Sequence, residues 1–228
     1  MKKLILAAFA LTTAASVFAQ GTISFNNNIS GLRTRVYAPL SSNPALSQIG
    51  NGSIDTPSGT TSWAGFAEIG AAGTGGQYGG ATTLLTFLGA PNTGDQQSSL
   101  QAGAGITTFK TGAGGGLISA TLTETFANIA PDYSSGATVE MVAWDDSTGL
   151  YSTWALASVA WEAGTIAAGE SDLVNITSTI GGTINTPPIL PNTLESFNLY
   201  YNVVPEPATF ALAGLGLATL LVLRRRNS

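Results

Sequence analysis

Two adjacent carboxylates, Asp145 and Asp146, are the first residues of this sequence whose types could support chemistry. They could ligate calcium together with loop carbonyls and Asp132, or supply one half of a glycosidase carboxylate pair. The spacing, however, lacks the Asp-x-Asp-x-Asp-Gly pattern of a calcium loop. The run Asp-Asp-Ser-Thr-Gly is also typical of a hairpin turn, in which short polar side chains bond their own backbone, and the sequence favours this turn.

Aromatic residues lie close to that turn in the sequence: Trp144, Tyr151, Trp154 and Trp161. On an exposed sheet face, Trp144 and Trp154 could stack on the apolar faces of sugar rings and make this a polysaccharide-binding module. Such residues more often fill a sandwich core, where each buries about 150–250 Å². Strand alternation places Trp144 on the same face as Glu140, and we expect that face to be the wetter one.

The sequence contains no histidine and no cysteine. The usual general base, the commonest transition-metal ligand, thiol nucleophiles and disulfides are therefore missing. A Ser-His-Asp hydrolase and a His-ligated zinc enzyme are excluded. The glycine-rich run 70–80 does not supply Gly-x-Gly-x-x-Gly, and no lysine follows it to hold a phosphate. We therefore expect a surface loop there, no cofactor, and a protein that is not an enzyme.

Acidic residues dominate the charge of the central region. Residues 20–204 contain three basic and twelve acidic residues, a net charge of −9. A negative surface repels phosphate backbones, which argues against a nucleic-acid partner. The acids Glu124, Glu162, Glu170 and Asp172 are isolated in the sequence, and we expect them at solvated positions.

The N-terminus has the three regions of a secretory signal peptide. Two lysines precede the short apolar run 4–11, and small residues lead to Val17-Phe18-Ala19. Small residues at the third-last and last positions fit the pockets of a signal peptidase. We predict a signal peptide at 1–19, cleaved between Ala19 and Gln20.

The C-terminus combines a proline motif, an apolar run and a cationic end. Pro205-Glu206-Pro207 precedes sixteen uncharged residues, 208–223, and then Arg224, Arg225 and Arg226. As a helix the run is about 24 Å long, so with snorkelling arginines it can span a bilayer. The prolines set its outer boundary, and the arginines stay cytoplasmic. We predict one transmembrane helix at 208–223, with the body outside the inner membrane and the tip of the tail in the cytoplasm.

This C-terminal arrangement resembles the PEP-CTERM sorting signal of Gram-negative bacteria. The resemblance covers residues 205–226 in the family's order. It implies that an exosortase, a membrane-embedded thiol protease, recognises Pro205-Glu206-Pro207 and removes the tail. It also implies only a transient stay in the inner membrane, followed by transfer of the body to the cell envelope, the outer surface or the extracellular matrix.

The region between the two ends is predicted to be all-β. Short segments rich in Thr, Val, Ile and aromatic residues are bounded by Gly, Pro, Asn or Asp, and no sustained helical period occurs. We therefore predict an antiparallel β-sandwich or jelly roll at 20–204, followed by the sorting signal 205–228. The expected strands are 21–28 (ending in a turn), 33–38, 82–88, 106–110, 117–125, 137–144, 151–159, 173–180 and 195–203.

These observations favour an exported surface or extracellular-matrix protein that is not an enzyme and associates with exopolysaccharide. A carbohydrate-binding adhesin is the first alternative, and it requires exposed tryptophans. A carboxylate-based glycosidase is the second, and it requires two acids about 5–10 Å apart across a cleft.

Overall fold

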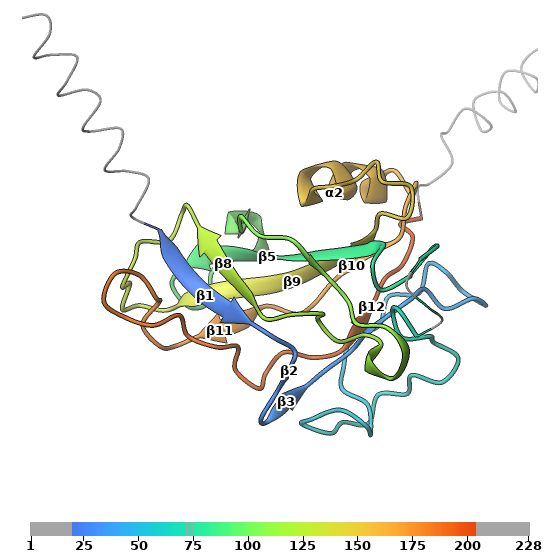
Figure 1. Cartoon of the computed structure of the whole chain (residues 1–228), viewed down its shortest axis with the longest axis horizontal. Coiled ribbons are helices and arrows are strands. Elements are labelled where there is room, and N and C mark those ends of the chain that lie inside the picture. Colours follow the sequence, from blue (N-terminus) through green and yellow to red (C-terminus); the bar gives the residue numbers. More distant parts are fainter. Residues whose placement is uncertain (1–19, 72, 74, 204–228) are drawn as a thin grey trace, which may run out of the picture.

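The structure is a computed structural model that describes residues 20–71, 73 and 75–203. These residues form mostly antiparallel strands with one α-helix, in agreement with the predicted all-β class (Figure 1). The predicted signal peptide with Ala19, the Pro205-Glu206-Pro207 motif, the span 208–223 and the arginines 224–226 lie outside the described residues.

Two of the strands, β5 and β9, are long, and the others are short. The strands are β1 (Gly21–Phe25), β2 (Asn28–Ile29), β3 (Leu32–Arg33), β4 (Val36–Tyr37), β5 (Thr83–Pro91), β6 (Gln101–Ala102), β7 (Thr107–Thr108), β8 (Leu122–Phe126), β9 (Ala137–Asp145), β10 (Ala168–Glu170), β11 (Val174–Ile176) and β12 (Phe197–Asn198). The helices are α2 (Trp154–Glu162) and the 3₁₀ turns η2 (Gln97–Ser99) and η3 (Gly112–Gly114).

β5 and β9 form the centre of the largest sheet. They pair antiparallel along all nine residues of each strand, from Thr83 opposite Asp145 to Pro91 opposite Ala137. β10 and β11 pair with β9, while β6 and β7 pair with β5. The predicted strands 82–88 and 137–144 correspond to this central pair, whose apolar and β-branched residues suit a buried pleated surface.

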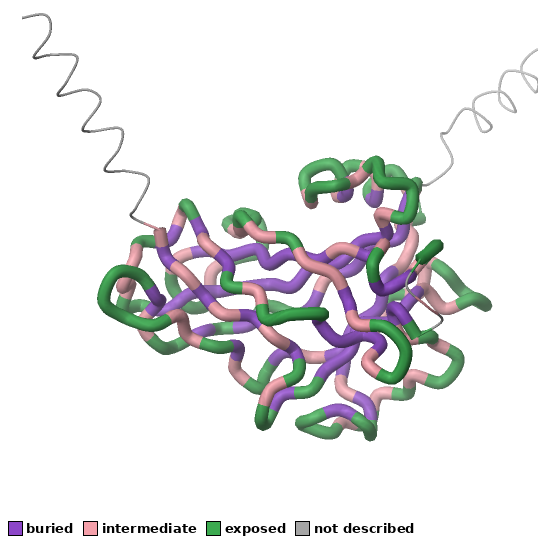
Figure 2. The backbone as a smooth tube through the Cα atoms, in the orientation of Figure 1, coloured by how far each residue is buried: buried purple, intermediate pink, exposed green. Residues whose placement is uncertain are grey.

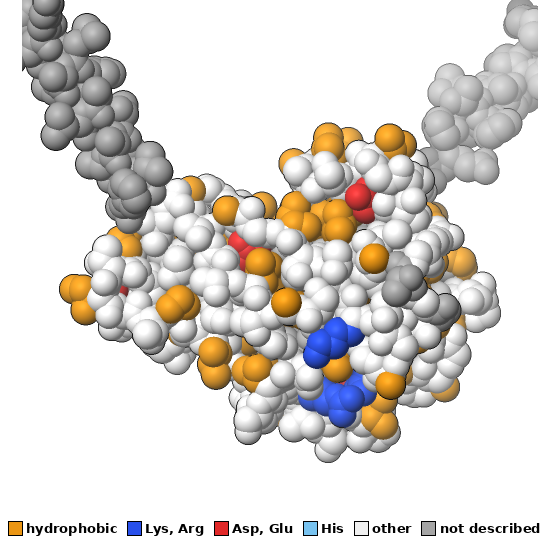
Figure 3. Space-filling model, in the orientation of Figure 1, with side chains coloured by type: hydrophobic (Ala, Val, Ile, Leu, Met, Phe, Trp, Pro, Cys, Tyr) orange, Lys and Arg blue, Asp and Glu red, His pale blue; other side chains and the backbone are white. Residues whose placement is uncertain are grey.

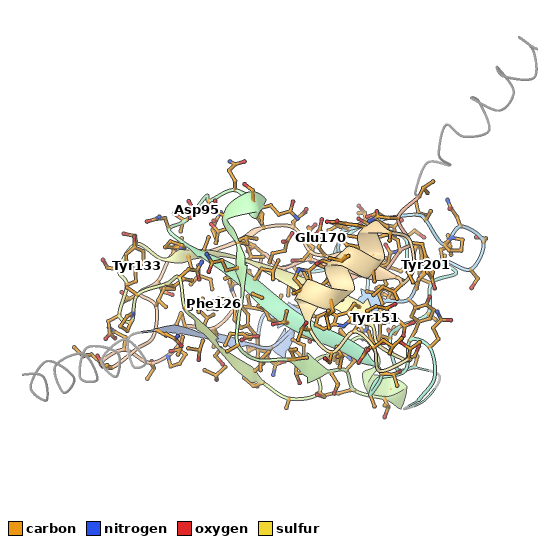
Figure 4. The ribbon with its side chains drawn as sticks, turned by 90° about the horizontal axis from the view of Figure 1, so that it is seen from above. Asp95, Phe126, Tyr133, Tyr151, Glu170 and Tyr201 are labelled. Carbon is orange, nitrogen blue, oxygen red and sulfur yellow. The ribbon has the colours of Figure 1, made fainter. Side chains whose placement is uncertain are left out.

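The β1–β8 pair covers one face of β5. Phe25 of β1 stacks on Phe87 of β5 with ring centroids 3.7 Å apart, and Phe126 of β8 meets Phe25 edge-on at 6.1 Å. The Phe126 ring leaves no room for a side chain at Gly89, because an added Cβ would lie 2.7 Å from it. The main core therefore lies between β1–β8 and the central sheet (Figure 4); its members include Ile23, Leu85, Val139, Met141 and Ile129.

The other face of β9 is buried too, and the expectation that the Glu140 and Trp144 face is the wetter one is wrong. All nine residues of β9 are buried (Figure 2). Ala157 and Trp161 of α2 pack in one cluster with Val142 and Trp144. A strand that is covered on both sides has no solvent-exposed face. The alternation of side chains along β9 therefore could not predict which of its residues are exposed.

The predicted strand at 151–159 is wrong, because most of that segment forms α2. Trp154, Ala157 and Trp161 recur at i, i+3 and i+7 and lie on one helical face. Alanines at 155, 157 and 160 also favour a helix. The prediction gave weight to the strand preference of Trp and Val, which depends on the neighbours that a residue packs against.

A buried ionic cluster ties three distant loops together. Arg35, between β3 and β4, places Nη1 3.1 Å from Asp55 Oδ1 and Nε 2.7 Å from Glu68 Oε1. Asp55 Oδ2 also accepts hydrogen bonds from the Gly52 amide at 2.7 Å and from Ser196 Oγ at 2.9 Å. We call Arg35, Asp55, Glu68 and Ser196 the Arg35 cluster. It fixes the loop 50–62 against the segment that leads into β12.

Replacing Arg35 by methionine should destabilise the fold by about 3–5 kcal/mol, because Asp55 would remain buried without its cation. Arg33→Met is the matched control, since Arg33 is exposed and the same change should cost under about 0.5 kcal/mol. Chemical denaturation of the two variants measures the difference. Equal costs would show that the ion pair does not stabilise the fold.

Candidate functional site

Asp145 is the last residue of β9 and Asp146 follows it at the start of a turn, but the turn connects β9 to α2 and not to another strand. Asp145 Oδ1 accepts a hydrogen bond from the Ser147 amide at 3.1 Å, and Asp146 Oδ1 accepts one from the Tyr151 amide at 2.7 Å. The Gly149 amide donates to the Asp146 carbonyl at 2.8 Å. Both carboxylates thus bond the local backbone, as the turn interpretation expects, while the predicted hairpin partner strand is wrong.

Asp132 does not join these two residues as a third calcium ligand. Its carboxylate instead accepts hydrogen bonds from Thr183, Ile184 and Asn185. The neighbouring Tyr133 lies at the opposite end of the molecule from Tyr151 (Figure 4). In the part of the chain that the structure describes, no group of three or more acidic side chains is placed to hold a metal ion. Calcium ligation at Asp145 and Asp146 would therefore have to rely on loop carbonyls.

The tryptophans near this turn form a packing cluster. Trp144 is 0% exposed, and its Nε1 donates to the Tyr151 carbonyl at 2.6 Å. Trp154 lies between Trp144 and Trp161, with ring centroids 5.7 and 6.0 Å away. In this arrangement Trp144 offers no face to a sugar, so the structure contradicts its assignment to a stacking platform, and Trp154 is only half-buried beside it. These rings hold α2 on the sheet.

Two glutamates are buried, although the sequence indicated a solvated position for one of them. Glu124 of β8 is 0% exposed and accepts hydrogen bonds from Thr86 Oγ1 at 3.0 Å and the Gly105 amide at 2.7 Å. Burial raises the pKa of its carboxyl. The expected solvated position of Glu124 is therefore wrong: its carboxyl group bonds Gly105, in the loop between β6 and β7. A single acidic residue between two threonines gives no local signal of this role.

Glu140 of β9 is the less well satisfied carboxyl. It is 2% exposed; Gln97 Nε2 donates to its Oε1 at 3.0 Å, and its Oε2 is buried without a partner. Burial, with a smaller effect from the charge of Glu170, raises its pKa to about 8. At neutral pH the carboxyl is mostly protonated, which reduces the cost of burying it.

A polar groove of about 560 Å³ lies between the loop 49–61 and the segment 192–195. Hydroxyl and amide groups dominate its lining, which includes Asn51, Ser58, Thr60, Thr61, Asn192, Thr193 and one carboxylate, Glu195. The Arg35 cluster holds both walls, because Ser196 bonds Asp55 and its amide also donates to Asn51 Oδ1 at 3.1 Å. The groove is thus a built feature of the fold, with neutral groups that suit a polyhydroxylated ligand.

A second hollow of about 300 Å³ adjoins the groove through Thr61 and contains an aromatic wall. Trp63 stacks on buried Tyr37 with centroids 4.2 Å apart, and its Nε1 donates to the Gly50 carbonyl at 3.0 Å. The half-buried Trp63 was missed in the sequence analysis, which considered only the tryptophans near Asp145. Its position in a loop rich in Ser, Thr and Gly was the available signal, since an isolated loop tryptophan needs a packing partner or a ligand.

The described residues thus form an all-β body with a polar groove, and comparison with known proteins identifies a sorting motif at the end of the chain. Residues 203–226 match the PEP-CTERM protein-sorting motif. The chain thus carries the sorting motif of an exosortase substrate, which confirms the prediction made from the Pro205–Arg226 arrangement. No curated protein and no solved structure is detectably similar to the chain.

The pKa of Glu140 predicts a specific pH dependence of stability. Because the folded-state pKa, about 8, lies above the unfolded value, ionisation opposes folding. The contribution of Glu140 to the free energy of unfolding should be greatest below about pH 4.5. Between that pH and about pH 8 it should fall by about 1.4 kcal/mol for each pH unit. Glu140→Gln should flatten that decline, as measured by denaturation between pH 5 and 9. The exposed Glu162→Gln variant should keep it, and a parent-like slope in Glu140→Gln would contradict the assignment.

Proposed function

We propose that this protein is a non-enzymatic surface or extracellular-matrix protein. An exosortase releases it from the membrane, and the released protein associates with exopolysaccharide. The observation that carries the proposal is the PEP-CTERM motif at 203–226, which implies an exported and membrane-processed protein. The remaining support comes from the surface of the body and from its polar groove.

The precursor would carry two removable ends. A signal peptidase would cut after Ala19, and the uncharged run 208–223 would hold the tail in the inner membrane until an exosortase acts on the Pro205-Glu206-Pro207 segment. The ordered body supports the first cut, because β1 begins at Gly21, whose amide donates to the Ile129 carbonyl at 2.7 Å. Among the described residues, no helix is long and apolar enough to cross a membrane.

The body has the surface chemistry of a polysaccharide-associated protein. It contains only fifteen charged residues between positions 20 and 204, and hydroxyl and amide groups supply much of its polarity. The lining of the polar groove is of the same kind, with Asn, Ser and Thr side chains that can exchange hydrogen bonds with sugar hydroxyls. A groove with one carboxylate, Glu195, on an acidic body disfavours anionic ligands and favours a neutral glycan.

A carbohydrate-binding adhesin is the second candidate, and Trp63 favours it. Its ring borders the hollow beside the groove, so a glycan could meet an aromatic surface and hydroxyl groups together. A glycosidase finds less support there, because Glu195 is the one acidic residue in the lining of the groove and the adjoining hollow has none among the described residues. Carboxylate catalysis needs two such groups across a cleft.

Mass spectrometry of the secreted protein should find an N-terminus at Gln20 and no residue of the segment 208–228. Glu206→Gln should retain the tail and stay with the membrane fraction, whereas Glu195→Gln, a change in the body, should be processed normally. Recovery of the peptide 224–228 from extracellular material would contradict the sorting proposal, because the arginines should remain in the cell.

Filling the groove should weaken retention on exopolysaccharide extracted from the producing strain. Thr193→Arg places a long cation at an exposed lining position, and we expect a loss of affinity of roughly tenfold, about 1.4 kcal/mol. Thr177→Arg makes the same change at an exposed position outside the groove and should bind like the parent. Affinity electrophoresis in the polysaccharide makes the comparison. Equal migration of both variants and parent would exclude the groove as the contact surface.

A further inference from the structure

The outward side of α2 is apolar. Leu156 is 52% exposed and Val159 is 67% exposed; they are three positions apart and therefore neighbours on one side of the helix, opposite the buried Ala157 and Trp161. Leu150, in the turn before the helix, is 68% exposed. We call Leu150, Leu156 and Val159 the α2 apolar face. Figure 3 shows hydrophobic side chains gathered on this edge of the molecule.

Glu162, the last residue of α2, is the one charged residue of the helix, and it is exposed three positions after Val159. No charged residue lies between Asp146 and Glu162 in the sequence, so α2 has no cation and far fewer ionic side chains than normally cover the solvent side of a surface helix. An apolar surface of this kind on an exported protein indicates a contact with an apolar environment.

The C-terminal end of the described chain lies directly beside α2. Trp161 Nε1 donates to the Tyr200 carbonyl at 2.9 Å, and the two rings meet edge-on with centroids 5.1 Å apart. Val203, three residues further on, is 76% exposed and is where the sorting motif begins. The described chain therefore ends next to the helix (Figure 1).

Chain length limits how far α2 can be from a membrane that holds the tail. The uncharged run begins at Ala208, eight residues after Tyr200. Eight residues span at most about 29 Å when fully extended. Because α2 packs on Tyr200, a membrane-embedded run would keep the helix within that distance of the bilayer surface.

We propose that the α2 apolar face rests on the outer surface of the lipid bilayer in the uncleaved precursor. The inference rests on the proposed membrane-held tail and adds a second contact made by the folded body. With no cation on the helix, the contact uses apolar insertion alone and does not select anionic lipid. The tether supplies a high local concentration, so a weak contact is sufficient while the tail is attached and is lost after cleavage.

The test uses the full chain, whose lack of cysteine allows a single fluorescent label. Val159→Cys and the control Ile184→Cys, which is 87% exposed in the loop bonded to Asp132, each carry a polarity-sensitive nitrobenzoxadiazole group. The proteins are reconstituted in vesicles of phosphatidylethanolamine and phosphatidylglycerol with brominated acyl chains. The label at 159 should shift to the blue and lose roughly half its emission, as a group at the headgroup–acyl boundary would, while the label at 184 should not.

Three other outcomes would overturn the inference. If the chain floats with the vesicles but the label at 159 shows neither a blue shift nor quenching, the tail is anchored and the α2 contact is absent. Failure of the chain to float with vesicles removes both the anchored precursor and the contact. A blue shift at position 159 without quenching by bromine means that protein, such as a second copy of the chain, covers the face.

Discussion

The burial of β9 on both faces is the constraint on which the rest of the body depends. A strand with nine buried residues needs an apolar layer on each side, and the chain provides two different ones. The β1–β8 pair supplies the first through stacked phenylalanines, and α2 supplies the second through tryptophans. The position of α2, and with it the outward direction of Leu156 and Val159, follows from the need to cover Trp144. An apolar surface near the C-terminus is thus a consequence of how the core is closed.

The loops are held by polar groups that do for this chain what disulfides do for many exported proteins. With no cysteine, the long connection between β4 and β5 has to be fixed by side chains, and the Arg35 cluster does so by joining it to the segment before β12. The buried Asn27 plays a similar part, since its amide donates to the carbonyls of Thr34 and Gly116 at 2.8 and 3.0 Å. The walls of the polar groove belong to these loops, so its shape depends on burying one arginine with its acids.

The sequence predicted the parts of this protein that depend on local composition. The sorting motif is a contiguous signal, and the central strands follow from runs of β-branched and apolar residues, so both could be predicted. The segment 151–159 could not be assigned from its residue types, because Trp and Val suit a strand while the 154, 157, 161 spacing suits a helix. The buried Glu124 and the pairing of Arg35 with Asp55 arise between residues far apart in the chain, and single charged residues give no local sign of their partners. Trp63 was overlooked for a related reason: its environment comes from Tyr37 and Gly50, which only the folded loop brings to it.

The polar groove and the α2 apolar face lie on opposite sides of the body. The loop segment 50–61, which lines the groove, lies on the side of the molecule opposite α2 (Figure 1). A precursor held by its tail with α2 toward the bilayer would therefore turn the groove away from the membrane. A glycan chain in the surrounding matrix could then reach the groove before the tail is removed, whereas a groove beside α2 would be blocked by lipid. Release by exosortase would then change the location of a protein whose groove is already accessible, and it would free the apolar side of α2 at the same moment.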